Sequence, residues 1–310
     1  MSPTGLTDAG DPDLPRGVAL AWGVAANPQR GPKRELSIER IVEAAVEIAD
    51  AGGLGAVSMA SVSASLGFTT MSLYRYVSAK DDLVLLMGEE GFGLPPESIR
   101  EATDWREGLR RWSHEQIAVF GRHPWLLDIP ITGAPLTPNS LAWLDAALEV
   151  LDDQPLDSEE KLSVSLTVMA QVRWWGTIER GNRDAAAAVG LSEGAIDRDA
   201  AAMLRTLVTP EQFPYLRRLI DDGAFEPGPD DPFAFGLNQV LDGIAGYIAT
   251  RPTDRVRPTV VGDDLAVTGD VRVREAAKHV RETEKNLREA RKNERQARTN
   301  ARERLRNARG

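Results

Sequence analysis

The sequence predicts an all-α fold, with an N-terminal helix-turn-helix domain of three or four helices and a larger C-terminal helical domain. Two observations predict this arrangement. Apolar residues recur at a helical spacing in successive segments between residues 36 and 250. One short helical segment ends at Gly67 and another follows directly, which is the spacing of a helix-turn-helix. The chain has 310 residues, 42% of them hydrophobic, and can therefore bury a sizeable core.

The first two helices are predicted from their ends and from their apolar faces. Ser37 can cap the first helix, which the glycine pair at 52–53 ends. Its apolar stripe consists of Ile38, Ile41, Val42, Ala45, Ile48 and Ala49. Ser58 can cap a second helix that faces the same core, and Gly67 can adopt the left-handed backbone that a sharp turn requires.

The third helix is predicted over residues 70–77, with one apolar and one polar side. Leu73 and Val77 share the side that must be buried against the first two helices. The residues on the opposite side and its flanks are Met71, Ser72, Tyr74 and Arg75. Arginine can donate to guanine or phosphate, methionine can contact a thymine methyl, and hydroxyl groups can reach phosphate, so this side suits a DNA major groove. The alternative is a surface helix that only closes a small bundle.

A fourth helix is predicted to begin near Ser78. Ser78 and Asp81 have the spacing of a capping box, and Lys80 lies in the first turn. A lysine at a helix N-terminus is unfavourable unless an anion lies there, and a DNA phosphate would satisfy both the lysine and the free backbone amides. An ordinary solvated lysine explains the position equally well.

The formal net charge of −10 hides two opposite parts of the chain. Residues 271–310 carry 14 lysines and arginines against 6 glutamates, a net +8, which leaves −18 for the rest. Basic residues nevertheless cluster around the helix-turn-helix: Arg30, Lys33, Arg34, Arg40, Arg75 and Lys80. Contact with phosphate depends on local charge, so the net acidity does not exclude DNA binding. The segment leading into the first helix is either a DNA-contacting basic arm or a solvated linker.

Residues 34–92 resemble the DNA-binding domain of the TetR family of transcriptional regulators. The resemblance is carried by IleGluArgIleValGluAlaAla at 38–45, SerMetAlaSerValSerAlaSerLeuGlyPhe at 58–68, SerLeuTyrArgTyrVal at 72–77 and LysAspAspLeu at 80–83. It implies that operator DNA contacts Thr69, Thr70, Met71, Ser72, Tyr74, Tyr76 and Lys80. Tetracycline repressors carry a base-reading arginine where this chain has Ala60, so the resemblance implies no operator sequence. The full predicted DNA-binding set is Lys33, Ser58, Thr69, Thr70, Met71, Ser72, Tyr74, Arg75, Tyr76 and Lys80.

Further helices are predicted at about 104–121, 138–151, 158–180 and 232–249. Helix 158–180 is apolar over too much of its circumference to have a single buried face. Helix 232–249 contains Gly236, Gly243 and Gly246, which lower helix propensity and suit the close approach of another helix. Both helices favour a bundle shared by two subunits, with a closed monomeric core as the alternative.

Residues 104–250 resemble the C-terminal domain of tetracycline-repressor-type TetR proteins. The clearest segments are TyrLeuArgArgLeuIle at 215–220 and AspProPheAlaPheGlyLeuAsnGlnValLeuAspGlyIle at 231–244. The resemblance implies that helices 158–180 and 232–249 form a four-helix dimer bundle, and that the remaining helices enclose an effector cavity. The metal-holding histidines of tetracycline repressors match positions near Pro96 and Asp128, so a tetracycline–magnesium ligand is not expected.

The effector site is predicted from aromatic and amide side chains in the C-terminal domain. Tryptophans gather there among a few polar residues, as in an apolar cavity with a small number of polar contacts. The predicted ligand-binding set is Trp105, Trp112, Gln116, Phe120, Asn139, Trp143, Gln171, Trp174 and Trp175. For any single tryptophan, plain core packing is the alternative. The expected effector is a small, largely apolar or aromatic molecule, with neither a metal nor a cofactor.

The predicted organisation has five parts. These are a mostly disordered extension (1–29), a DNA-binding domain (30–92), an effector-binding and dimerisation domain (93–252), a linker (253–270) and a basic tail (271–310). In the tail, Val273, Val280, Leu287 and Ala301 recur in sevens, but Glu294 interrupts the repeat. We therefore expect an exposed helix or a disordered segment rather than a coiled coil.

Composition excludes several classes of protein. Without cysteine there is no disulfide or cysteine nucleophile, and three histidines make a histidine-rich metal site improbable. No apolar run is long enough to span a membrane and no signal peptide is visible, so a cytoplasmic protein is expected. The acidic pairs 152–153 and 263–264 resemble loop or cap residues, so no enzyme is predicted. The sequence predicts a ligand-responsive homodimeric repressor of a palindromic operator; a helical adaptor without specific DNA binding is the alternative.

Overall fold

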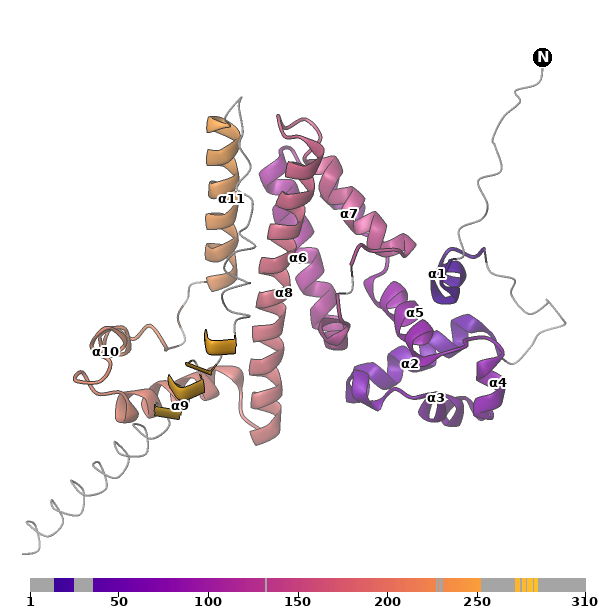
Figure 1. Ribbon diagram of the computed structural model, residues 1–310, viewed down its shortest axis with the longest axis horizontal. Coiled ribbons are helices and arrows are strands. Elements are labelled where there is room, and N and C mark those ends of the chain that lie inside the picture. The colour runs from indigo at the N-terminus through magenta and orange to yellow at the C-terminus, as the bar shows by residue number, and fades with distance from the viewer. Residues whose placement is uncertain are drawn as a thin grey trace, which may run out of the picture. The chain divides into compact units, whose positions relative to one another are not determined.

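The computed structural model describes residues 14–24, 36–131, 133–226, 228, 231–251, 271–273, 275–276, 278–280 and 282–283. These residues form helices and no strand (Figure 1). The α-helices of residues 14–251 are α1 (Arg16–Ala21), α2 (Ile38–Gly52), α3 (Met59–Leu66), α4 (Thr70–Tyr74), α5 (Lys80–Phe92), α6 (Trp105–Arg122), α7 (Pro138–Val150), α8 (Ser158–Val189), α9 (Glu193–Leu207), α10 (Pro214–Asp221) and α11 (Pro232–Thr250). The 3-10 helices are η1 (Leu54–Ala56), η2 (Glu97–Ile99) and η3 (Pro124–Asp128).

The first helices begin and end where the sequence predicts. The Ser37 side chain accepts a hydrogen bond from the Arg40 N–H at the start of α2. Ser58 and Ser61 form a reciprocal capping box at the start of α3. Gly67 ends α3 in the left-handed conformation, with φ 74° and ψ 25°. The predicted boundaries of the helix-turn-helix are confirmed at these positions.

Two helix ends around α4 and α5 differ from the prediction. The α-helix of α4 ends at Tyr74 rather than at 77, because the following amides close a tighter turn onto the Leu73 carbonyl. The predicted capping box of Ser78 and Asp81 is wrong. The extended residue before α5 is Ala79 and the first helical residue is Lys80, and the Ala79 methyl group cannot accept a hydrogen bond from the first-turn amides.

Helix α8 extends nine residues beyond the predicted end, to Val189. Asp157 and Glu160 form a capping box at its start, and Gly190 ends it with φ 66°. The additional residues include four consecutive alanines at 185–188, the best helix formers. Residues 190–192 separate α8 from α9, a helix outside those predicted from the sequence.

The expectation of a mostly disordered N-terminal extension is wrong for residues 14–24. Helix α1 packs on α5, and Val18 is only 4% exposed. The Gly17 N–H donates to Asp82 Oδ1 (3.0 Å), and Trp22 Nε1 donates to the Leu136 carbonyl (2.8 Å). Apolar burial and two long-range hydrogen bonds therefore order this short helix.

One hydrophobic core extends through both groups of helices. It includes Ile41 and Leu73 from the helix-turn-helix, and Trp112, Val168 and Leu237 from the helices after η2. Helix α6 packs against α7 and α8, α8 packs against α11, and α5 contacts both α2 and α7 (Figure 1). Among the described residues, no helix is long and apolar enough to cross a membrane.

The chain divides into two units after Arg251, and the described residues beyond that point belong to the second unit. Its described residues between 271 and 283 are helical, and Val273 and Val280 are exposed, as expected for a solvated tail helix. The predicted linker and the remainder of the predicted tail lie outside the described residues.

Candidate DNA interface and effector site

The short helix α4 packs against α3 and turns its polar side outward. After the turn at Gly67, the Thr69 side chain accepts from the Ser72 N–H (3.3 Å) and caps α4. Leu73 on α4 and Val77 just after it are fully buried. Met71 is 73% exposed on the opposite side. The alternation that the sequence predicts is therefore present, and α4 presents a surface of the size that enters a major groove.

The structure brings most of the predicted DNA-binding residues to this surface. Thr69, Thr70, Met71, Tyr74, Arg75 and Lys80 are exposed, and Ser58 and Ser72 are partly buried. Tyr76 differs, because it is 8% exposed and belongs to the hydrophobic core, where it supports α4 from within. Lys33 lies outside the described residues.

The start of α5 combines a lysine with uncapped backbone amides. Lys80 is exposed and has no carboxylate at ion-pair distance in the described part of the chain. No side chain accepts from the amides of the first turn. Asp81 and Asp82 lie in the same turn, and Asp82 accepts the Gly17 N–H. A phosphate oxygen at this helix end would be held by Lys80 and the free amides.

Three predicted effector residues form one row along α6. Trp112, Gln116 and Phe120 are each separated by four residues and are at most 3% exposed. Trp112 Nε1 donates to the Trp143 carbonyl (2.8 Å), and Trp143 Nε1 donates to the Gly93 carbonyl (3.1 Å). The buried Nε2 of Gln116 has no hydrogen-bond partner among the described residues.

A second group joins α6, α8 and α11. The Phe233 ring on α11 contacts Trp175 and His114, with ring centroids 5.9 and 5.6 Å apart. Gln171 lies against Gly236, where a Cβ atom would come within 2.6 Å of Gln171 Nε2. Glycine at 236 therefore permits the close approach of α8 and α11.

The remaining members of the predicted effector set lie apart from these groups. Trp174 on α8 is 64% exposed, so it does not line the interior of this subunit. Trp105 is partly buried beside the Arg106 guanidinium. Asn139 is bonded to Glu89, to which its backbone N–H and its side-chain amide both donate.

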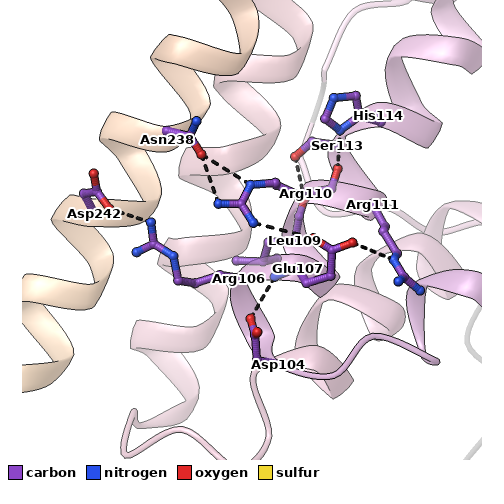
Figure 2. A network of polar contacts seen from close by, with 10 residues as sticks. All are labelled: Asp104, Arg106, Glu107, Leu109, Arg110, Arg111, Ser113, His114, Asn238 and Asp242. Carbon is purple, nitrogen blue, oxygen red and sulfur yellow. Dashed lines mark hydrogen bonds and ion pairs between the residues drawn. The ribbon is translucent and has the colours of Figure 1, made fainter.

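Arginines of α6 connect this helix to α11 (Figure 2). Arg106 donates to Asp242 Oδ1 (2.5 Å) and to the Leu241 carbonyl (3.1 Å). Arg110 donates through Nε and Nη2 to Asn238 Oδ1 (3.3 and 3.1 Å). These hydrogen bonds join α6 to α11 at two successive turns.

The chain matches two sequence profiles in neighbouring regions. "Bacterial regulatory proteins, tetR family" matches residues 41–87, and "Tetracyclin repressor-like, C-terminal domain" matches residues 99–248. The HTH-type transcriptional repressor DrrR1 of Streptomyces coeruleorubidus is 34% identical over 246 residues, which are 78% of this chain and 90% of that protein. The chain belongs to the TetR family. It is thus a transcriptional regulator with a DNA-binding helix-turn-helix.

Solved TetR-family structures share the fold. Apo ActR from Streptomyces coelicolor has a TM-score of 0.58 at 22% identity, covering 71% of this chain and 100% of that chain. ActR in complex with actinorhodin has a TM-score of 0.57 at 24% identity, covering 68% and 96%. Both matches place a helix-turn-helix domain before a helical C-terminal domain, as the sequence predicts.

Two polar contacts between the TetR-type domains were not predicted. Asp50 Oδ1, at the end of α2, accepts from Trp125 Nε1 (2.6 Å) and lies 2.8 Å from His123 Nδ1. The second contact joins the Glu89 carboxylate on α5 to the Asn139 N–H at the start of α7 (2.7 Å). No sequence pattern identified Asp50 as the partner of His123 and Trp125. Helices α2 and α5 are therefore each bonded to the effector domain.

Proposed function

We propose that this TetR-family protein is a homodimeric repressor that leaves a palindromic operator when a small, largely aromatic effector binds its C-terminal domain. The observation that carries the proposal is α4, which buries Leu73 and exposes Met71, Tyr74 and Arg75 at one surface. The relative DrrR1 is named a repressor, and ActR was solved with actinorhodin. Both descriptions agree with this assignment.

The outer faces of α8 and α11 support a homodimer. Leu162, Leu166 and Trp174 are 41, 51 and 64% exposed, and their spacings of four and eight residues put them on one stripe that winds gradually around α8. Phe235 on α11 is 68% exposed. At Gly243 and Gly246 on α11, a Cβ position has no atom within 4 Å among the described residues beyond the chain neighbours and the adjoining helix backbone. An apolar stripe beside glycines that cost helix propensity is suited to close packing against a second copy.

Effector control follows from the spacing of two α4 helices in such a dimer. Successive major grooves on one side of DNA are about 34–36 Å apart, so both α4 helices enter them only at that separation. An effector that binds better to another separation lowers operator occupancy by its difference in affinity between the two states. The bonds of Asp50 and Glu89 across the domain boundary connect the effector helices to this spacing.

The experiment is selection of bound duplexes from random DNA at fixed salt, followed by titration of variants on the selected site. Tyr74→Ala should abolish specific binding, and Lys80→Gln should weaken binding and lower the salt slope by about one. Lys161→Gln is the matched control, because this lysine on α8 is already paired with Asp152. Recovery of no consensus site, or indifference of binding to Tyr74 and Lys80, would support an adaptor instead.

The dimer has a separate test by sedimentation equilibrium. Trp174→Glu introduces a charge into the exposed stripe without disturbing the interior of the subunit. We expect the wild type to sediment as a dimer and the variant as a monomer with weaker operator binding. A monomeric wild type would refute the proposal, and an undisturbed dimer in the variant would exclude the α8 stripe as its interface.

A further inference from the structure

Arg173 on α8 is a partly buried cation without an acidic partner in the described part of the chain. Its guanidinium lies over the Phe120 ring, 5.7 Å from the centroid, and its Nη2 donates to the Leu127 carbonyl (3.2 Å). The carbonyl and the ring are both neutral. Burial lowers the pKa of Arg173, because the surroundings disfavour the charged form.

Other partly buried arginines in the described residues each have a carboxylate. They are Arg100 with Glu149, Arg106 with Asp242, Arg110 and Arg111 with Glu107, Arg180 with Asp128, and Arg217 with Asp221. Removing a guanidinium from water costs free energy that an opposite charge offsets. Arg173 departs from this pattern and is therefore suited to an anion supplied by a ligand.

Aromatic and apolar groups surround the Arg173 guanidinium. Phe120 is shared: Arg173 lies over its ring, Phe92 packs against its edge (5.9 Å), and Gly176 on α8 comes close to it. Gln116 lies one turn before Phe120 on the same face of α6, and its buried Nε2 has no partner in the part of the chain that the structure describes. A cationic donor and a neutral donor thus both border the row of aromatic side chains on α6.

We propose that Arg173 is the anion anchor of the effector site and that the effector is an aromatic carboxylic acid. The inference rests on the effector-controlled repressor proposed above. The guanidinium holds the carboxylate through two parallel N–H···O bonds, while the aromatic part lies along the Phe120 row. Gln116 Nε2 donates to a second oxygen of the ligand. A neutral amide of the same shape lacks the charge, so the site binds it more weakly than the acid.

The test uses isothermal titration of the full-length, DNA-free protein with anthraquinone-2-carboxylate and with anthraquinone-2-carboxamide. The two probes match in shape and differ in charge. Wild type should bind the acid at least about tenfold more tightly than the amide. A hydrogen bond to a charged group contributes more free energy than a neutral one, and the difference corresponds to about that ratio of dissociation constants. Arg173→Gln should remove this preference and leave the affinity for the amide unchanged, which also demonstrates that the variant is folded.

Two further variants separate the outcomes. Arg183→Gln removes the same charge from an exposed position on α8 and should keep the preference for the acid. Arg173→Lys keeps the charge without the planar fork and should retain only part of it. Equal affinity of wild type for both probes, no binding of the acid, or an unchanged preference in Arg173→Gln would overturn the proposal. A dimer weakened by Arg173→Gln with unaltered acid binding would assign Arg173 to the subunit interface instead.

The proposal and the repressor function fail in different ways. Operator titration without any ligand tests the DNA-binding function alone. Loss of operator binding with intact preference for the acid would leave the anion anchor standing and remove the repressor. Intact operator binding without preference for the acid would leave the DNA-binding function standing and remove the anion anchor.

Discussion

Gln116 permits a sharp test of the interior of the effector domain. Its side chain is 3% exposed and its Nε2 has no partner in the described residues, so the folded protein loses hydration of that group without compensation. An unsatisfied buried donor costs about 1–3 kcal/mol. Gln116→Met has nearly the same shape and no donor, so little cavity or strain arises. We expect the variant to raise the free energy of unfolding by about 1–3 kcal/mol.

The assay is urea denaturation of both proteins at one protein concentration, with the midpoint and slope fitted separately. Ser113→Ala is the control on the same helix, because the buried Ser113 hydroxyl already donates to the Leu109 carbonyl (2.7 Å). Removing that bond lowers the free energy of unfolding by about 0.5–1.5 kcal/mol. The better helix propensity of alanine raises it by about 0.5 kcal/mol. The control should therefore be no more stable than wild type, whereas Gln116→Met should be more stable.

A fall in stability for Gln116→Met would refute the reasoning, because it would show that Nε2 has a hydrogen-bond partner in solution. The same variant has a second readout. If Gln116 donates to an effector, Gln116→Met should bind anthraquinone-2-carboxylate more weakly although its fold is more stable. Greater stability with reduced ligand affinity is the combination expected of a polar group retained for binding.

Three further predictions concern packing, pH and the N-terminal helix. In Gly108→Ala the new Cβ atom would lie 2.6 Å from Val150 Cγ1, so urea denaturation should show a free energy of unfolding lower by about 1–3 kcal/mol. Adding Val150→Ala should relieve this clash. Gly121→Ala on the same helix meets no atom of the described residues within 4 Å and should raise the free energy of unfolding by up to about 1 kcal/mol. Hydrogen bonds from the Tyr247 hydroxyl and the Asp157 N–H, with help from Arg251, lower the pKa of Glu160 from 4.5 to about 2. The carboxylate therefore stabilises the fold above pH 4.5 and loses that contribution as the pH falls towards 2; Glu160→Gln should be less stable at pH 7, and its deficit relative to wild type should shrink across this window. Trp22→Phe removes the Nε1 donor to Leu136 and should speed hydrogen exchange of α1 amides while leaving α8 unchanged; equal exchange in α1 would show that the bond does not hold the helix.

Local features of the sequence predicted much of the fold because they act over a few residues. The capping serines Ser37 and Ser58, the left-handed Gly67 and the apolar pair at 73 and 77 are each determined by neighbours within one or two turns. The start of α5 was misplaced by one residue because Ser78 has the side chain of a good cap, whereas the extended residue directly before the helix is Ala79.

The candidate site was predicted less completely, because its members are chosen by contacts between distant segments. Asp50 and Trp125 are 75 residues apart, and no pattern pairs an aspartate at a helix end with a later tryptophan. Trp174 and Trp175 are adjacent in the sequence, yet one is exposed and the other packs on Phe233. Aromatic composition identified the domain that holds the effector set but could not separate buried members from those on the outer face.

In the proposed mechanism helix α5 would act as a lever, and its two ends differ in chemistry. Lys80 begins it at the proposed phosphate contact, and Glu89, nine positions later, accepts the amide at the start of α7. At 1.5 Å per residue these positions are about 13.5 Å apart, so a tilt of about 5° pivoting at Glu89 moves Lys80 by about 1 Å. In a symmetric pair, the two displacements would add across the DNA. A ligand that rotates α7 only slightly would then change the separation of the two α4 helices enough to prevent both from entering the DNA grooves.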